Sequence, residues 1–225
     1  MKVLILAGGF GTRISEYTKT IPKPMLKIGN KPILEHIINS AKKNRFKNFV
    51  ISVHYLSKKI INYFKNGEKF NIKVRYIVEE RPYGTAGSLR FLKKKTLLPI
   101  VVSNGDILTN LNYEDLLDFH KKKKSDLTIV VRSLVHKNPY GVVNIIKNRV
   151  SSLEEKKDLV MNINAGIYVI NPKVLTLLKH KKIDMPDFIN LLIKNKKKIF
   201  SFPLNDNWID IGTKKNLNFS KKMIN

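Results

Sequence analysis

The first 131 residues alternate short apolar runs, rich in valine and isoleucine, with longer stretches in which apolar residues recur every three or four positions. Short apolar runs predict buried β-strands, and the longer period predicts amphipathic helices. We predict strands at residues 2–7, 48–53, 72–78, 100–103 and 127–131, and helices at residues 32–43, 56–65, 85–92 and 113–124. This repeated order is typical of an α/β fold, in which helices cover both faces of a mainly parallel sheet.

The pattern changes after about residue 132. Strands predicted at residues 141–146, 150–155 and 163–170 follow one another without helices, short helices begin near Pro172 and Pro186, and residues 199–202 form another strand. The chain contains no internal repeat, low-complexity linker or clear boundary. We therefore expect residues 1–225 to form a single domain with two halves, about 1–131 and 132–225.

Composition narrows the class of protein. Hydrophobic residues make up 43% of the 225, which is enough for a sizeable core. No apolar run approaches the roughly 20 residues needed to cross a bilayer, and the apolar start of the chain leads into glycines rather than a signal-peptide cleavage site. The absence of cysteine excludes disulfides and thiolate metal sites and fits a reducing compartment. We expect a cytoplasmic protein that does not bind membranes.

The formal net charge of +26 raises the possibility of a nucleic-acid-binding protein. However, lysines are spread along the whole chain, mostly near the ends of predicted helices, where cations are favourable. Aromatic residues do not form a stacking platform with them. The pattern favours a solvated, lysine-rich surface that steers polyanionic substrates, and no nucleic-acid partner. The five histidines have no metal-ligand spacing and are interpreted as structural or surface residues.

A glycine-rich segment, Leu6-Ala7-Gly8-Gly9-Phe10-Gly11-Thr12-Arg13, directly follows the first predicted strand. Glycines let backbone N–H groups approach phosphate oxygens, and Arg13 can neutralise the phosphate charge. The spacing fits neither the Walker loop nor the dinucleotide-binding fingerprint, because no Gly-Lys-Ser/Thr follows and the segment past Arg13 is expected to be a polar loop. We interpret it as a different kind of phosphate-binding loop.

With its further motifs, the chain resembles the nucleoside-diphosphate-sugar pyrophosphorylases, also called sugar-1-phosphate nucleotidyltransferases. The motifs that follow the glycine-rich segment, in the family's order, are Pro22-Lys23-Pro24, Pro82-Tyr83-Gly84-Thr85-Ala86-Gly87, Asn104-Gly105-Asp106, Tyr140-Gly141-Val142-Val143, Glu154-Glu155-Lys156, Asn164-Ala165-Gly166 and Trp208-Ile209-Asp210-Ile211-Gly212. The resemblance covers almost the whole chain. It implies a Rossmann-like, glycosyltransferase-A-like fold with a nucleotide-binding half at about 1–131 and a sugar-binding half at about 132–225.

The resemblance also assigns roles on the nucleotide side. It implies that Arg13, Lys23 and Asp106 are catalytic and that Asp106 and Asp210 hold Mg²⁺. Asp106 follows a predicted strand, where ligands gather in open α/β sheets, and carboxylates suit the oxygen-seeking ion. The implied nucleotide-binding residues are Leu6, Ala7, Gly8, Gly9, Gly11, Thr12, Arg13, Glu79, Gly84, Thr85 and Ala86. Taken alone, Asp106 fits a turn or helix cap equally well.

The sugar-phosphate contacts implied by the resemblance lie mainly in the second half of the chain. They are Asn104, Gly141, Glu155, Lys156 and Asn164. Without the resemblance, neighbouring glutamate and lysine residues are typical of a surface ion pair. The chain also departs from the family here, because Lys157 stands where the family usually has a proline. The loop is therefore less constrained than in the family.

The expected reaction transfers a nucleoside monophosphate from an NTP to a sugar 1-phosphate, for surface glycan synthesis. Glu79 favours GTP, since a carboxylate can accept the two adjacent donors of guanine, although a solvated strand end explains Glu79 equally well. The motifs look like those of guanylyltransferases acting on hexosamine or heptose 1-phosphates. Uridylyl or thymidylyl transfer, a non-catalytic regulatory homologue and a nucleic-acid-binding protein are the alternatives. The sequence predicts a stand-alone catalytic domain and leaves homo-oligomerisation open.

Overall fold

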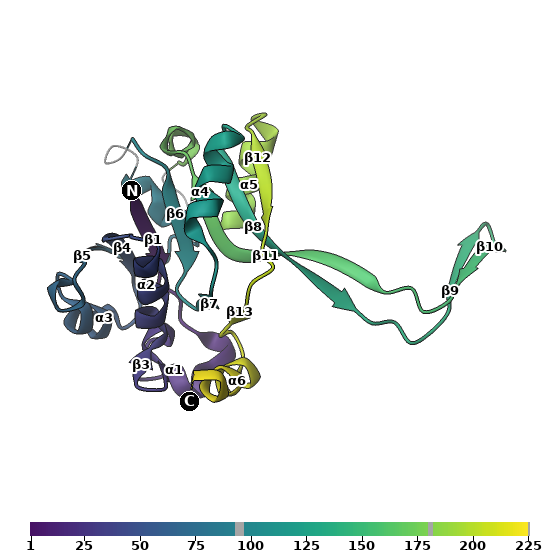
Figure 1. Ribbon diagram of the computed structural model, residues 1–225. Helices are drawn as coiled ribbons and strands as arrows, with labels where there is room; N and C mark the ends of the chain where they lie inside the picture. Colours follow the sequence, from purple (N-terminus) through teal and green to yellow (C-terminus); the bar gives the residue numbers. More distant parts are fainter. Residues whose placement is uncertain (93–96, 180–181, 225) are drawn as a thin grey trace.

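The computed structural model describes residues 1–92, 97–179 and 182–224, and its centre is a seven-stranded sheet with the order β12-β8-β11-β6-β1-β4-β5 (Figure 1). The strands are β1 (Lys2–Leu6), β4 (Asn48–Val53), β5 (Lys73–Val78), β6 (Ile100–Asn104), β8 (Leu127–His136), β11 (Leu159–Ile170) and β12 (Ile199–Pro203). β11 is antiparallel to both of its neighbours, and the other neighbouring pairs are parallel. The predicted mainly parallel α/β sheet is confirmed.

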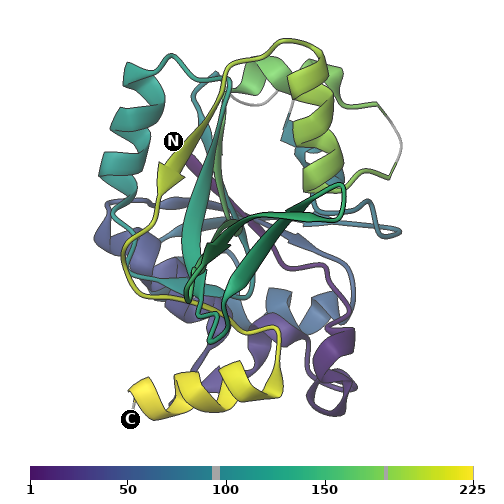
Figure 2. The same ribbon diagram turned by 90° about the vertical axis from the view of Figure 1, so that its right-hand side faces the viewer.

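Helices cover both faces of the sheet, and alternate strand residues face the two layers (Figures 1 and 2). One layer contains α2 (Ile33–Lys43), α3 (Ser57–Phe64) and α4 (Tyr113–Lys122). The other contains α5 (Met185–Lys194) and two 3₁₀ segments, η4 (Gly87–Leu92) and η5 (Pro172–Leu177). On β1, Val3 and Ile5 pack into the first layer, whereas Leu4 packs into the second. This period of two is what a strand buried on both faces requires.

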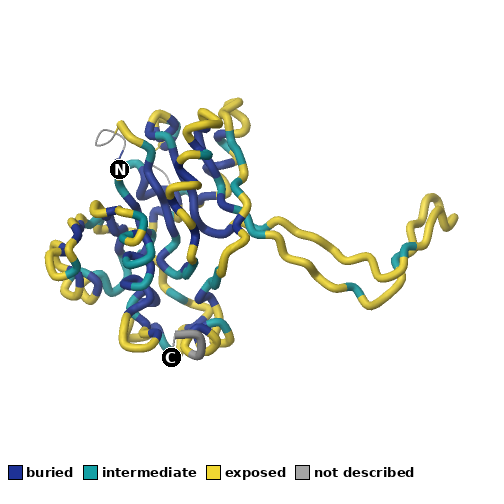
Figure 3. The backbone as a smooth tube through the Cα atoms, in the orientation of Figure 1, coloured by how far each residue is buried: buried dark blue, intermediate teal, exposed yellow. Residues whose placement is uncertain are grey.

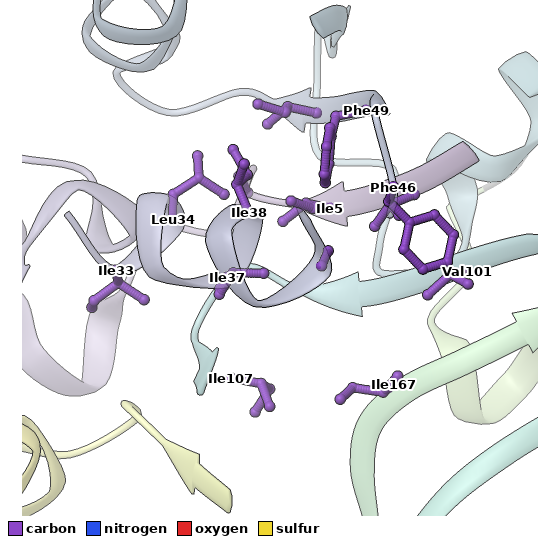
Figure 4. Close-up of a cluster of buried hydrophobic side chains, with 14 of the residues drawn as sticks. Ile5, Ile33, Leu34, Ile37, Ile38, Phe46, Phe49, Val101, Ile107 and Ile167 are labelled. Carbon is purple, nitrogen blue, oxygen red and sulfur yellow. The ribbon is translucent and has the colours of Figure 1, made fainter. Parts of the chain in front are cut away.

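Packing of α2 against the sheet anchors the nucleotide-side half predicted from the sequence. Figure 4 shows Ile38 of α2 lying beside Ile5 of β1 and Phe49 of β4. All three side chains have 1% of their surface exposed or less. Burying an aliphatic or aromatic side chain of this size contributes about 1.5–3 kcal/mol. The strand whose end leads into the glycine-rich segment is therefore held firmly in the core.

Several predicted elements differ in the structure. Residues 85–92 were predicted as a helix, but only Gly87–Leu92 is helical, as a 3₁₀ segment. The backbone N–H groups of Thr85 and Ala86 instead donate to Asp184 and Ile183. The expected polar loop past Arg13 is wrong, since η1 (Thr12–Ile14) and α1 (Ser15–Thr18) follow, with Ile14 buried.

The sequence pattern missed short elements and the last helix. These are η2 (Lys23–Met25), β2 (Lys27–Ile28), β3 (Lys31–Pro32), η3 (Glu68–Phe70), β7 (Ile107–Thr109), β13 (Trp208–Asp210) and α6 (Lys214–Ile224). α6 has too few apolar residues to show a helical period, although Leu217 anchors it in the core. β7 and β13 are three residues each and gain their structure from pairing with one another.

A long two-stranded arm leaves the sheet. β8 and β11 continue as a pair from the Arg132–Ile163 position outward, and the hairpin of β9 (Val142–Ile146) and β10 (Arg149–Glu154) forms the tip. We call residues 132–163 the arm. Figures 1 and 3 show that it stands clear of the body and is almost entirely exposed. The predicted strands 127–131 and 163–170 therefore both extend further into the arm than expected.

The charged surface follows the expected pattern where it is described. Lysines occupy the last turns of α2, at Lys42 and Lys43, and of α4, at Lys121 and Lys122. The lysines at 93–95 and His180 lie outside the described residues. Within residues 1–92, 97–179 and 182–224, no helix combines the length and apolar character needed to span a membrane.

His120 is a buried titratable group on α4. Its side chain is enclosed, with 2% of the residue exposed, and Nδ1 lies 2.9 Å from the Thr128 hydroxyl of β8. Burial lowers the pKa of His120 to about 4, and the nearby negative charge of Asp126 only partly opposes this. The residue is therefore a neutral structural histidine, as the absence of metal-ligand spacing suggested.

We predict that His120 makes the protein less stable in mild acid. Because its pKa is lower in the folded state, the stability is fully present above the unfolded pKa of 6.5 and is lost as the pH falls toward 4, by up to about 3 kcal/mol. Urea unfolding at pH 7.5 and 4.5 measures this loss. The His120→Asn variant, which retains a group able to bond Thr128, should lose less stability over the same interval. Equal losses in the two proteins would contradict the prediction.

Candidate active site

A cleft of about 360 Å³ opens at the carboxyl ends of β1 and β6. The lining residues that the sequence singled out are Leu6, Ala7, Gly8, Gly9, Gly11, Thr12, Arg13, Lys23, Glu79, Gly84, Thr85, Asn104 and Asp106. Neighbouring parallel strands end at the same edge of the sheet, so side chains distant in sequence gather there. Ala86 is the predicted nucleotide-binding residue that does not line the cleft, because it is fully buried in the core beneath it.

The glycine-rich segment forms an open floor on one side of this cleft. A side chain added at Gly9 would meet no heavy atom within 4 Å, so its backbone is freely approachable. Gly11 has a φ of 67°, and an added Cβ would lie 2.9 Å from Thr18. Glycine is therefore required at this turn for both conformation and space. Backbone N–H groups exposed in this way suit phosphate oxygens.

Gly105 packs against Leu6 and Ala7 at the start of the glycine-rich segment. Its backbone N–H donates to the carbonyl of Leu6 at 2.9 Å, and an added Cβ would lie 2.7 Å from that oxygen. The turn after β6 thus packs directly on the end of β1. This close approach fixes the position of Asp106, the next residue, relative to the glycine-rich segment.

Four charged residues from remote parts of the chain lie close together at the cleft: Arg13, Lys23 and Asp106 line it, and Asp210 lies near them without lining it. Lys23 forms an ion pair with the carboxylate of Asp106, and both side chains are largely buried. The neighbouring segment containing Asp210 is positioned by the β7–β13 pairing, in which Asp210 lies opposite Ile107. The charges of Lys23, Arg13 and Asp106 all act on Asp210. The expected proximity of the two aspartates is therefore observed.

Asp210 carries an unbalanced buried charge. Burial raises the pKa of its carboxyl, the negative charge of Asp106 raises it further, and Lys23 and Arg13 oppose the shift. Its Oδ1 atom is buried and has no hydrogen-bond partner in the described part of the chain. An acceptor left without a donor beside a second carboxylate fits a divalent cation that prefers oxygen ligands.

The described residues hold no cluster of three or more histidine, cysteine or acidic side chains that could bind a metal by themselves. Asp106 and Asp210 could supply two oxygens, and other ligands would have to come from a bound substrate or water. Mg²⁺ is commonly held in this way, by one or two carboxylates and substrate phosphates. The two aspartates therefore fit Mg²⁺ as partners of a phosphate-bearing molecule.

Glu79 also lines the cleft, close to Gly8, and is held rigidly. Its residue is 9% exposed, so the interpretation as a solvated strand end is wrong. Ser52 donates a hydrogen bond to Oε1 at 2.6 Å, and the backbone N–H of Tyr83 donates to Oε2 at 3.1 Å. Each carboxylate oxygen has a second acceptor direction, so Glu79 can still accept from a ligand.

Asp184 is a cleft residue that the sequence analysis missed. The backbone N–H of Thr85 donates to its Oδ1 at 2.9 Å, and the Thr85 hydroxyl accepts from the N–H of Met185 at 2.7 Å. The segment between 182 and 185 is thereby fastened to the Gly84 turn. The only signal in the sequence is an aspartate before Met185-Pro186, which suggests a helix start rather than a cleft.

Asn104 and Asn164 meet where the arm joins the body. Asn164 accepts from the N–H of Gly166 at 2.9 Å and donates to the Tyr168 hydroxyl at 2.6 Å. Gly166 has a φ of 74°, and an added Cβ would lie 2.7 Å from the Asn104 amide nitrogen. These two predicted sugar-side residues are therefore brought together, and Asn104 lines the cleft directly.

The other predicted sugar-side residues lie elsewhere. Gly141, Glu155 and Lys156 sit on the exposed outer part of the arm and are absent from the cleft lining (Figures 1 and 3). They stay close to one another, since a Cβ added at Gly141 would lie 3.5 Å from Glu155 Oε2. The structure thus assembles the predicted nucleotide side but not the whole predicted sugar side, and the role of these three residues stays a prediction.

Comparison with known proteins agrees with this geometry. A family model described as nucleotidyl transferase matches residues 2–223. Mannose-1-phosphate guanyltransferases of Debaryomyces hansenii and Schizosaccharomyces pombe are 35% and 36% identical over 96% of this chain, which spans only 62% of their length. Among solved structures, HddC from Yersinia pseudotuberculosis is 27% identical with a TM-score of 0.80, covering 100% of this chain and 99% of HddC. HddC has also been solved in complex with GMP-PN, with a TM-score of 0.79.

We predict that Mg²⁺ raises the melting temperature of the protein and that Asp210→Asn abolishes this rise. The variant should be at least as stable as the wild type without metal, because it removes a charge that burial and Asp106 both disfavour and whose Oδ1 atom has no donor among the described residues. Thermal unfolding across a Mg²⁺ titration measures both effects, since a ligand present at about 100 times its Kd stabilises by about 2.7 kcal/mol. Asp118→Asn, on an exposed carboxylate of α4, is the matched control. Equal Mg²⁺-dependent rises in all three proteins would remove Asp210 from the site.

Proposed function

The chain belongs to the nucleotidyl transferase family, and we propose that it transfers a nucleoside monophosphate from an NTP to a sugar 1-phosphate and releases pyrophosphate. The observation that carries this proposal is the convergence of Arg13, Lys23, Asp106 and Asp210 beside an open glycine floor. Two cations next to exposed backbone N–H groups suit a triphosphate, and two carboxylates suit its accompanying metal. The retention of all four residues opposes a purely regulatory role.

The proposed reaction is an in-line displacement. A phosphate oxygen of the sugar 1-phosphate forms a bond to the α-phosphorus of the NTP, and the bond from that phosphorus to the bridging oxygen of pyrophosphate breaks. The attacking oxygen is already ionised at neutral pH, so no general base is needed. Catalysis then depends on positioning the two phosphates and neutralising the charge that builds up between them.

The position of Lys23 suits the neutralisation of phosphate charge. It is 9% exposed, it lies between Pro22 and Pro24, and Asp106 holds its ammonium group at the cleft. A lysine restrained in this way loses little further entropy when it contacts phosphate. Arg13 adds a second cation near Asp210. Mg²⁺, when bound by Asp106 and Asp210, would supply further neutralisation of the triphosphate.

We propose GTP as the preferred nucleotide. Glu79 presents acceptors only, and guanine offers adjacent N1–H and N2–H donors, whereas uracil and thymine offer one donor between two acceptors. The guanyltransferase relatives and the HddC complex with GMP-PN support this choice. The named relatives also favour mannose 1-phosphate or a similar hexose 1-phosphate as acceptor, and glycan synthesis as the use of the product. Uridylyl or thymidylyl transfer is the alternative.

The remaining proposals concern the roles of the two halves of the chain, its location and its partners. Residues of about 1–131 would bind the nucleotide and residues of about 132–225 the sugar phosphate. A cytoplasmic location, where NTPs are available, fits a chain without cysteine. The spread of lysines along the chain supports substrate steering rather than a nucleic-acid partner.

We predict that Lys23→Ala and Asp106→Ala each lower kcat/KM by about 100- to 1000-fold, as expected when a group that stabilises developing charge is removed. The assay measures pyrophosphate release from GTP and mannose 1-phosphate in the presence of Mg²⁺. Lys27→Ala, at an exposed position on β2, serves as the control and should retain wild-type activity. Wild-type rates in both cleft variants would refute the proposed function.

We also predict that GTP gives the highest kcat/KM among four NTPs and that Glu79→Gln reduces this preference by about 10- to 100-fold, the discrimination expected of a lost pair of hydrogen bonds. The variant keeps the shape of the side chain but places an N–H donor against the guanine donors. Glu80→Gln, on the exposed neighbouring residue, is the matched control. A wild-type preference for UTP or dTTP would reject the guanine assignment.

A further inference from the structure

The arm exposes an unusual amount of apolar surface. Eleven large apolar side chains between residues 134 and 161 are 40–75% exposed. They are Leu134, Val135, Tyr140, Val143, Ile145, Ile146, Val150, Leu153, Leu159, Val160 and Met161. Where such side chains share one face, a contiguous apolar patch marks an interaction surface in soluble proteins.

The hairpin at the tip has one face that is wholly aliphatic and one mixed face, called the polar face, on which polar side chains accompany Val142 and Ile146. Its register places Val143 opposite Leu153 and Ile145 opposite Val150, so these four side chains share one face. On the other face the Asn144 amide donates to Ser152 at 2.8 Å and to Glu154 at 3.0 Å. We call the first set the apolar face. In antiparallel sheets with this division, the apolar face is normally packed against another layer of structure.

The hairpin is well formed locally but lacks support. Lys147 and Asn148 have φ values of 45° and 63°, as the two-residue turn of a right-handed twisted hairpin requires. An isolated two-stranded hairpin is nevertheless marginally stable in water and needs a packed face. Figure 1 shows the tip standing clear of the body. The covering surface must therefore come from elsewhere.

We propose that the apolar face packs against the same face of a second copy of this chain, so that two arms lie alongside one another about a twofold axis. A face that meets its own copy needs only to be self-complementary, and four uncharged aliphatic side chains satisfy this. An acidic protein or a nucleic acid would find no cation among them.

The charge of the chain favours a contact made through an arm. Two chains that each carry a formal charge of +26 repel at short range, and salt screens this repulsion over about 8 Å at physiological ionic strength. An arm that extends away from the body places the contact where this repulsion is weaker. The geometry therefore separates the charged bodies while burying the uncharged apolar face.

The apolar face alone is too small for a standard dimer interface. A standard interface buries about 800 Å² per partner, more than four aliphatic side chains can supply. The contact must therefore extend along the part of the arm nearer the body. There Leu134 lies opposite Met161, and Leu159 lies on the same strand as Met161. All three are at least 40% exposed. We infer a contact that runs along the arm rather than one limited to its tip.

Sedimentation velocity on the full chain tests the proposal. The wild type should dimerise between about 1 and 100 µM, the weak end of the affinities seen for interfaces of this size. Ile145→Glu should weaken the dimer at least about 100-fold, because it places a charge in an apolar contact. Ile146→Glu is the matched control, since Ile145 and Ile146 are 64% and 65% exposed on the same strand but lie on opposite faces. Circular dichroism should show that both variants remain folded.

A second measurement identifies the covered face directly. The chain has no cysteine, so Leu153→Cys and Ser152→Cys each introduce a single thiol, on the apolar and the polar face. In the dimer, a maleimide should label the Leu153→Cys variant more slowly than the Ser152→Cys variant. Dilution to monomer should remove this difference in labelling rate.

The outcomes are decisive. A wild-type protein that stays monomeric, an Ile145→Glu variant that still dimerises, or equal weakening by both glutamates would overturn the proposal. Slow labelling at position 153 in a monomeric sample would show that the body of the same chain covers the face instead. Because these readouts do not involve catalysis, they stand apart from the proposed enzymatic function.

Discussion

The pairing of β7 with β13 is the constraint on which the charged end of the cleft depends. The backbone N–H of Ile211 donates to the carbonyl of Asp106 at 2.9 Å, which holds two carboxylates side by side despite their repulsion. Lys23 balances Asp106, but Oδ1 of Asp210 has no donor among the described residues. The fold thus keeps an unsatisfied acceptor in a buried place, which is costly unless a ligand makes use of it.

Two other carboxylates that line the cleft follow a different physical rule. The carboxylate of Glu79 is fixed by Ser52 and by the backbone of Tyr83, and Asp184 is fixed by Thr85. These groups are satisfied internally before any ligand arrives, so their geometry is set in advance. Asp106 and Asp210 therefore offer unbalanced charge, whereas Glu79 and Asp184 offer preorganised hydrogen-bond acceptors.

Much of this arrangement was accessible from the sequence, because the strands of the body carry strong apolar signals and the glycine-rich segment follows the first of them directly. The family motifs then located Lys23, Asp106 and Asp210. Asp184 was missed because its position depends on a contact with Thr85, 99 residues away. The course of the arm was missed for a similar reason: alternating residues predict strands, but no local pattern says whether a strand pair folds back onto the body or extends from it.

The junction between the arm and the sheet has a consequence for how such chains can vary. The register of β11 against β8 shifts between Asn164 and Tyr168, where Gly166 has left-handed backbone geometry, so the ladder of the arm and the ladder of the body are joined by an irregularity. Lengthening or shortening both arm strands by two residues preserves which side chains share a face. The length of the arm can therefore change by two residues per strand at a time without altering the cleft.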